Sequence, residues 1–137
     1  MRAMVRGLTM VLALAAASGA LAAGRPNPEG EAKLAKRLEG LVPGKPVHCI
    51  SLHPTESSEI IEGTAILYNG PGGRIYVNRP RSGADTLRRD DILVTRTITA
   101  QLCNTDIVTL VEPMSHFSKG FVNLGDFVPY AKPKPKP

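Results

Sequence analysis

Several short motifs of enzymes and metal proteins are missing from the 137-residue sequence, which also has no tryptophan. There is no Gly-x-Ser-x-Gly or Ser-x-x-Lys motif to indicate a hydrolase, and no Gly-Lys-Ser/Thr follows the glycine-rich run at 70–73. Cys-x-x-Cys is also absent, and the spacing of His48, His53 and His116 matches no metal-binding pattern. The sequence therefore predicts no cofactor and no metal.

Excess positive charge is confined to the two ends of the chain. The formal net charge is +5, but two arginines lie in the first six residues and three lysines in the last six. Residues 23–131 carry twelve basic and twelve acidic side chains. Nucleic-acid binding requires cations clustered on the folded domain itself, so we expect no nucleic-acid partner.

The N-terminus has the pattern of a secretory signal peptide. A basic start is followed by a short apolar run and small residues, which predicts a signal peptide over 1–22 with cleavage after Ala22. No later apolar run is long enough to cross a bilayer, so no transmembrane segment is expected after cleavage. We expect a linker at 23–30, one globular domain at 31–131, a Lys/Pro tail at 132–137, and a periplasmic or secreted location.

Two cysteines, Cys49 and Cys103, remain after the predicted cleavage. Exported proteins fold in oxidising compartments, so the sequence predicts a disulfide between them. In the chain-entropy treatment, closing a loop of this length stabilises a fold by about 4 kcal/mol. Two free buried thiols are the alternative.

A hairpin centred on 60–81 organises the expected fold. Apolar runs at 64–68 and 74–78 flank a turn rich in glycine and proline, the composition that reverses a chain. The run at 59–68 changes its alternation near Gly63, which predicts a β-bulge or bend there. A leucine stripe over 31–41 predicts one short amphipathic helix, ended by Gly40.

Other apolar runs predict further short strands. The expected strands are 47–52, 59–68, 74–78, 92–97, 106–111, 120–123 and 126–130. Four of the six aromatic residues lie near the C-terminus, so we expect that segment to pack into the core. The fold class is therefore mainly β, a small antiparallel barrel or curved sheet of about six short strands with one N-terminal helix and a disulfide. An open α+β sheet is the alternative.

Five short runs carry a resemblance to a protein family. They are Gly-Thr-Ala-Ile at 63–66, Tyr-Val-Asn-Arg-Pro-Arg at 76–81, Asp-Ile-Leu-Val-Thr at 91–95, Gln-Leu-Cys at 101–103 and Phe-Val-Pro-Tyr at 127–130. Over about 47–130 the chain resembles short uncharacterised exported proteins of Gram-negative bacteria. The resemblance implies export and two cysteines. It implies no activity, so no functional residue is carried over.

Clustered arginines are the main candidate for a binding site. Guanidinium groups suit carboxylate or phosphate ligands, and the candidate anion-binding residues are Arg79, Arg81, Arg88 and Arg89. The competing interpretation is a salt-bridged surface in which the arginines pair with Asp85, Asp90 and Asp91.

These features favour a small exported, disulfide-stabilised binding or structural module of the cell envelope. Its ligand is unknown, and an anionic envelope component is the candidate partner. The alternative is a small periplasmic enzyme whose site is built from Arg79, Arg81, Asp91 and His116.

Overall fold

The computed structural model describes residues 27–53 and 57–136. The predicted signal peptide and residues 23–26 of the predicted linker lie outside these ranges. Within them, no helix combines the length and apolar character that crossing a bilayer demands. The tail residues 132–136 are exposed and belong to no helix or strand.

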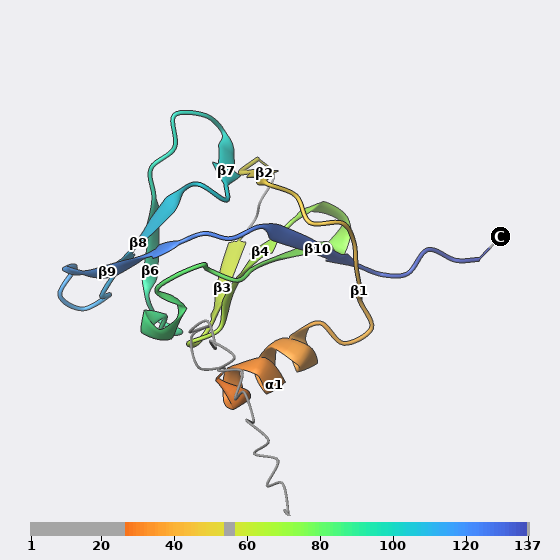
Figure 1. Ribbon diagram of the computed structural model, residues 1–137, viewed down its shortest axis with the longest axis horizontal. Helices are drawn as coiled ribbons and strands as arrows, with labels where there is room; N and C mark the ends of the chain where they lie inside the picture. The colour runs from red at the N-terminus through yellow and green to blue at the C-terminus, as the bar shows by residue number, and fades with distance from the viewer. Residues whose placement is uncertain (1–26, 54–56, 137) are drawn as a thin grey trace, which may run out of the picture.

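In its described residues the protein is mainly β, with one α-helix and ten short strands in three antiparallel sheets (Figure 1). Sheet A has the order β1-β10-β5-β4-β3, sheet B pairs β2 with β7, and sheet C has the order β6-β8-β9. The elements are α1 (Pro28–Arg37), β1 (Val42–Pro43), β2 (Cys49–Ser51), β3 (Ser57–Ile61), β4 (Ala65–Asn69), β5 (Ile75–Asn78), β6 (Ile92–Thr95), β7 (Gln101–Cys103), β8 (Ile107–Val111), β9 (Ser118–Asn123) and β10 (Phe127–Ala131).

Helix α1 begins and ends earlier than the leucine stripe predicted. The side chain of Asn27 accepts a hydrogen bond from the Gly30 amide at 3.3 Å, and Pro28 occupies the first turn. Both residues favour a helix start at this point, so the expected linker already contains the N-cap. The helix ends at Arg37, and Gly40 takes a φ of 78° in the turn that follows.

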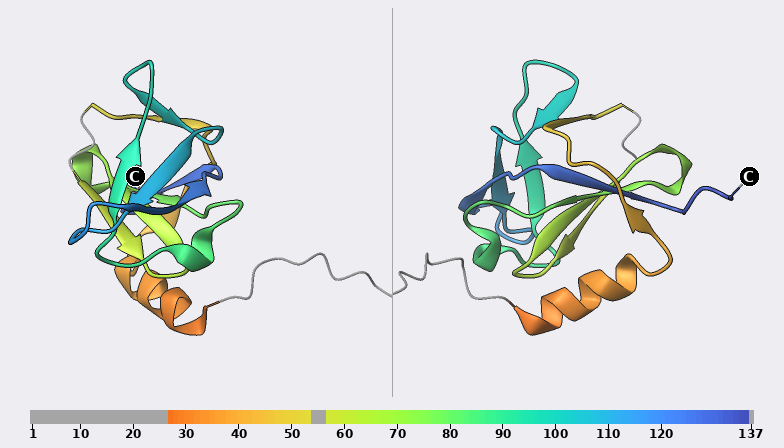
Figure 2. Two further views of the ribbon diagram at one scale, coloured as in Figure 1. Left: turned by 90° about the vertical axis from the view of Figure 1, so that its left-hand side faces the viewer. Right: turned by 45° about the vertical axis from the view of Figure 1, so that its right-hand side comes forward.

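Sheet A is covered on both faces because its central strands are apolar on both faces. On β4, Ala65 and Leu67 pack with Leu34 of α1, whereas Ile66 and Tyr68 point into the main core. Successive strand side chains alternate between faces, so one apolar run serves both layers. Figure 2 shows α1 lying along the outer side of sheet A.

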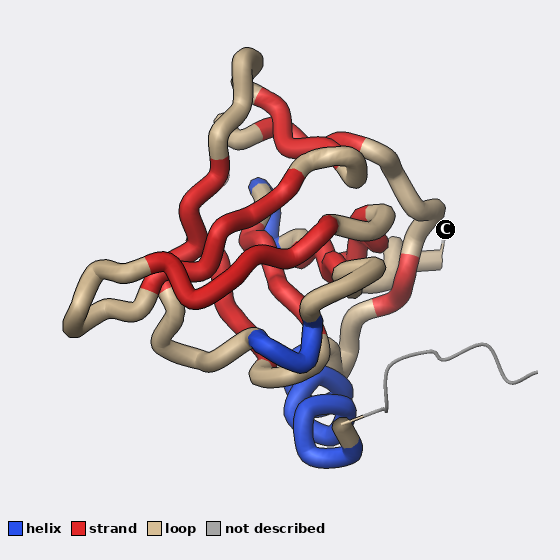
Figure 3. Tube along the Cα trace, turned by 60° about the vertical axis from the view of Figure 1, so that its left-hand side comes forward, coloured by secondary structure: helices blue, strands red, loops and turns tan. Residues whose placement is uncertain are grey.

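The main core lies between the three sheets. Buried side chains from all three meet there, namely Ile50, Ile60, Ile66, Tyr68, Leu87, Leu102, Val108, Leu110, Val122, Leu124 and Phe127. The sheets curve around this core, as the trace in Figure 3 shows, but they do not close into a barrel. Strands β3 and β6 each pair with one neighbour only, so the barrel that the sequence suggested is wrong, whereas its mainly β character is confirmed.

The central hairpin is confirmed, and its surroundings differ from expectation. Strands β4 and β5 pair antiparallel, joined by a turn that contains the short 3₁₀ segment Pro71–Gly73. Gly63, with a φ of 64°, forms no bulge but the tip of a second hairpin, β3–β4. This extra turn divides one expected strand into two, and the very short strands β1 and β7 were not expected, so the seven expected segments become ten strands.

The predicted disulfide is confirmed, and Cys49 lies directly opposite Cys103 in the pairing of β2 with β7. The prediction for the aromatic residues is only partly confirmed. Phe127 is fully buried, whereas Phe117 and Phe121 are 75% and 59% exposed. Phe121 lies on the outer face of sheet C, which no other described element covers.

Candidate functional site

Three of the four candidate anion-binding arginines are engaged within the fold. Arg79 donates two hydrogen bonds to the carboxylate of Glu31, at 2.6 and 2.8 Å. This contact lowers the pKa of Glu31 and raises the pKa of Arg79. Arg81 donates to the main-chain oxygens of Leu124 and Asn104, and therefore ties the segment before β10 to the loop after β7.

Arg88 is likewise held by contacts within the fold. Its guanidinium donates to the main-chain oxygens of Asp85 and Leu87 and lies 3.9 Å from the carboxylate of Glu62. Arg89 differs, because no hydrogen bond or ion pair joins it to any other described residue. Of the candidate set, Arg89 is thus the cation available to a ligand.

The structure does not bring the four residues of the enzyme alternative into one cleft. Arg79 and Arg81 line a cavity of about 270 Å³ beside the start of α1. Asp91 is buried elsewhere, where its carboxylate accepts hydrogen bonds from Lys119 Nζ at 2.6 Å and the Arg88 amide at 2.9 Å. His116 lies in the turn between β8 and β9. These four residues therefore do not line one common cleft in the described structure.

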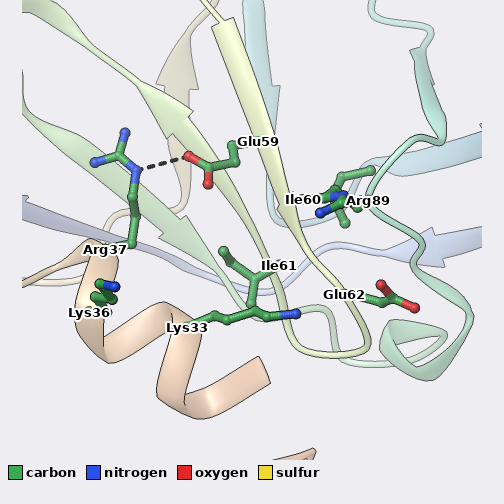
Figure 4. Close-up of a pocket in the computed structure, with 8 residues that line it drawn as sticks. All are labelled: Lys33, Lys36, Arg37, Glu59, Ile60, Ile61, Glu62 and Arg89. Atoms are coloured by element: carbon green, nitrogen blue, oxygen red, sulfur yellow. Dashed lines mark hydrogen bonds and ion pairs between the residues drawn. The ribbon is translucent and has the colours of Figure 1, made fainter. Parts of the chain in front are cut away.

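A cationic cleft lies between α1 and the edge of β3. It has a volume of about 390 Å³, and Ile60 and Ile61 of β3 are among the residues that line it. Four cations and two carboxylates line it, namely Lys33, Lys36, Arg37, Arg89, Glu59 and Glu62. Figure 4 shows three of these cations on α1 to one side of β3 and Arg89 on the opposite side.

Two of the four cations in this cleft have carboxylate partners. Arg37 donates to Glu59 at 2.9 Å, and Lys33 pairs with Glu29 one helical turn earlier at 2.8 Å. Lys36 resembles Arg89 in having no partner among the described residues. The cleft therefore presents two exposed positive charges that the fold leaves uncompensated.

A second cleft adjoins the first on the other face of β3. It has a volume of about 500 Å³ and lies between β3 and β6, lined by Ser58, Glu59, Ile60, Arg89, Asp91, Ile92 and Leu93. Glu59, Ile60 and Arg89 line both clefts. We call the two together the β3 groove, because the free edge of β3 runs along its middle.

A polar cluster near the disulfide was not foreseen from the sequence. Asp126 accepts hydrogen bonds from the side chains of Asn104 at 2.6 Å and His48 at 3.1 Å, and these contacts lower the pKa of Asp126. The side chains of His48 and Asp126 are 80% and 48% exposed. The cluster links the two strands of sheet B to the start of β10.

The sequence identified Arg89 but missed the helical half of the groove. Lys33, Lys36 and Arg37 resemble the solvated polar face of any short amphipathic helix. The available signal was their position next to Leu34, which must dock on the sheet and so brings its neighbours to the edge of the sheet.

No known protein family matches the chain, and neither a curated protein nor a solved structure matches it. The functional argument consequently depends on the geometry of the β3 groove and the chemistry of its lining.

Proposed function

We propose that this protein is a disulfide-stabilised binding module of the cell envelope that takes an anionic ligand in the β3 groove. The observation that carries the proposal is the presence of two unpaired cations, Lys36 and Arg89, on either side of β3. Residues 23–131 are formally neutral, so this local excess of positive charge is not a consequence of a basic domain.

The lining also favours a ligand with an apolar portion. Ile92, which is 43% exposed, and the half-buried Leu93 line the cleft beside β6, and burying apolar surface there adds affinity of about 25 cal/mol per Å². Exposed ion pairs alone contribute little, because water and salt screen them. An anion with apolar groups beside its charge therefore suits the groove better than a bare inorganic ion.

The envelope location is supported by the chemistry of the cysteines. A disulfide between Cys49 and Cys103 forms and persists in oxidising compartments, and it is rare in the cytosol of mesophiles. The signal-peptide pattern at 1–22 points to the same route. Fractionation of cells that express the tagged full-length chain tests this part: the protein should appear shortened and outside the cytoplasm, and an unprocessed cytoplasmic product would contradict it.

The ligand proposal is tested by fluorescence anisotropy with a fluorescein-labelled oligoglutamate and the purified, oxidised protein. In the variant Lys36→Glu/Arg89→Glu, two attractions become repulsions, each worth about 0.5 kcal/mol or more at an exposed site. We expect the dissociation constant to rise about tenfold. Increasing the salt concentration should weaken binding to the wild type.

A matched variant separates the groove from overall charge. Lys45 and Arg96 are exposed and lie outside both clefts. Lys45→Glu/Arg96→Glu changes the net charge by the same amount and should leave the dissociation constant within about twofold. An equal loss of affinity in both double variants, or no binding by the wild type, would refute the proposal.

A further inference from the structure

We propose that the ligand of the β3 groove is an extended polypeptide that adds to the free edge of β3 as an extra strand, with acidic and apolar side chains in alternation. The inference rests on the proposed anion-binding function and names its ligand class. It begins from the pairing of β3, which contacts β4 on one side and no described strand on the other. Unpaired backbone N–H and C=O groups along a strand edge form a template for another strand.

Strand β3 itself lacks two of the features that usually prevent such pairing. Protected edges often carry proline or lysine, and β3 carries neither. Strand β3 reads Ser-Ser-Glu-Ile-Ile, with small exposed serines at its start. Its only charged residue, Glu59, is held by Arg37 at 2.9 Å. An incoming strand therefore meets neither a bulky nor an uncompensated charged group from β3 itself.

The two clefts of the β3 groove match the alternation of a strand. Glu59 and Ile61 face α1, whereas Ile60 faces the main core beside β6. Figure 4 likewise shows Ile61 directed toward the helix and Ile60 directed away from it. Successive side chains of an added strand would point alternately into the cleft beside α1 and the cleft beside β6.

The two clefts differ in chemistry, and this difference predicts the peptide sequence. Lys33 and Lys36 line only the cleft beside α1, so acidic residues suit those positions of the added strand whose side chains point into this cleft. Ile92 and Leu93 line only the cleft beside β6, so apolar side chains suit the other phase. The carboxylate of Asp91 on that side is already neutralised by Lys119.

The length of the site follows from the strand. β3 has five residues, and at about 3.3 Å per residue its edge spans about 17 Å. A partner segment of about five or six residues fills it. Main-chain hydrogen bonds would supply affinity, and the two clefts would supply selectivity, as in other cases of strand addition.

The test compares two fluorescein-labelled octapeptides of the same composition. In one, glutamate and valine alternate, and in the other the glutamates and valines form separate blocks. The alternating peptide should bind the oxidised protein at least about tenfold more tightly. It should also slow amide hydrogen exchange within 57–61, while exchange in β10, which β4 and β5 separate from β3, stays unchanged.

Backbone N-methylation of the alternating peptide provides the sharper measurement. Only every second peptide amide can donate to β3, so methylating one alternating set should abolish binding and methylating the other should weaken it less than about threefold. Equal loss with both sets, or equal affinity of the two octapeptides, would overturn strand addition. If Lys36→Glu/Arg89→Glu still lowers the affinity for both octapeptides, only strand addition is refuted and the anion-binding function stands. If that variant has no effect on either affinity, the anion-binding function itself is refuted.

Discussion

We predict that Tyr68→Phe makes the protein more stable, because the hydroxyl of Tyr68 is buried without a hydrogen-bond partner among the described residues. Tyr68 is 5% exposed, and its hydroxyl has no hydrogen-bond partner in the described structure. Its ring packs edge-on against Phe127 with centroids 5.8 Å apart. Tyr68→Phe keeps this ring contact and removes only the unsatisfied polar atom.

The magnitude follows from the cost of burying an unpaired hydroxyl. That cost is about 1–3 kcal/mol in proteins, whereas the ring contributes similar apolar burial in both residues. We expect the free energy of unfolding to rise by about 1–2 kcal/mol. For a domain of this size, the melting temperature should increase by about 4–8 °C for each kcal/mol.

Urea unfolding followed by far-ultraviolet circular dichroism measures the change with the disulfide intact. Tyr76→Phe is the matched control, because Tyr76 is only half-buried and its hydroxyl accepts an exposed hydrogen bond from Arg74 at 3.3 Å. Its free energy of unfolding should change by less than about 0.5 kcal/mol.

The same variant makes a prediction about pH. Burial raises the pKa of Tyr68 in the folded protein, whereas an unfolded tyrosine ionises near pH 10. Above about pH 10 the unfolded wild-type chain loses the Tyr68 proton, whereas the folded protein retains it. The free energy of unfolding of the wild type therefore falls as the pH rises. The advantage of Tyr68→Phe over wild type should widen as the pH rises from 9 to 11. A destabilised Tyr68→Phe would show that the hydroxyl is hydrogen-bonded, and a constant difference across this range would show that burial does not raise the pKa of Tyr68.

Three further predictions concern the contacts that hold the sheets together. Replacing Cys49 and Cys103 by alanine opens a loop with a sequence separation of 54 and should lower the free energy of unfolding by about 4 kcal/mol, measured by urea unfolding. The buried carboxamide of Asn78 accepts a hydrogen bond from the Gly125 amide at 3.0 Å and donates one to the Gly125 main-chain oxygen at 2.7 Å. Asn78→Ala leaves both groups without a partner and should lower the free energy of unfolding by about 2–4 kcal/mol in the same assay. Glu31→Gln should flatten stability below about pH 4.3, since a carboxylate whose pKa is lowered by Arg79 contributes stability above its unfolded pKa and loses it as the pH falls.

Each of these predictions has an outcome that would contradict it. An alanine double variant as stable as the oxidised wild type would mean that the disulfide does not constrain the unfolded chain. Asn69→Ala removes an exposed hydrogen bond to Ser57 and is the control for Asn78→Ala, so equal losses would refute the role of burial. An unchanged acid profile in Glu31→Gln would show that the ion pair with Arg79 is too screened to matter.

Sequence patterns predicted those features that depend on local chemistry or on one strong constraint. Glycine and proline at 69–73 gave the central hairpin, because they allow a tight reversal wherever the flanking runs are apolar. The pairing of Cys49 with Cys103 followed from there being only two cysteines. Errors arose where signals conflicted: Gly63 suggested a bulge in one strand, but its left-handed φ makes it the turn between two strands.

The candidate site was only partly visible in the sequence. Arg89 was named with three other arginines that proved to be bound to Glu31 or to main-chain oxygens. Nothing local distinguishes these four side chains, since a guanidinium finds its partners only after distant segments meet. Lys36 was overlooked for the same reason, because its place beside β3 depends on how α1 docks.

The amino-acid sequence alone determined that the chain is mainly β, that one short helix precedes the strands, and that two cysteines pair. These outcomes follow from alternation, turn residues and composition, which act over a few positions. Tertiary structure decided which strand edges stay unpaired and which cations lack partners. Both depend on contacts between residues far apart in the chain, and the gap between β3 and β6 exists only because the three sheets curve around one core without closing.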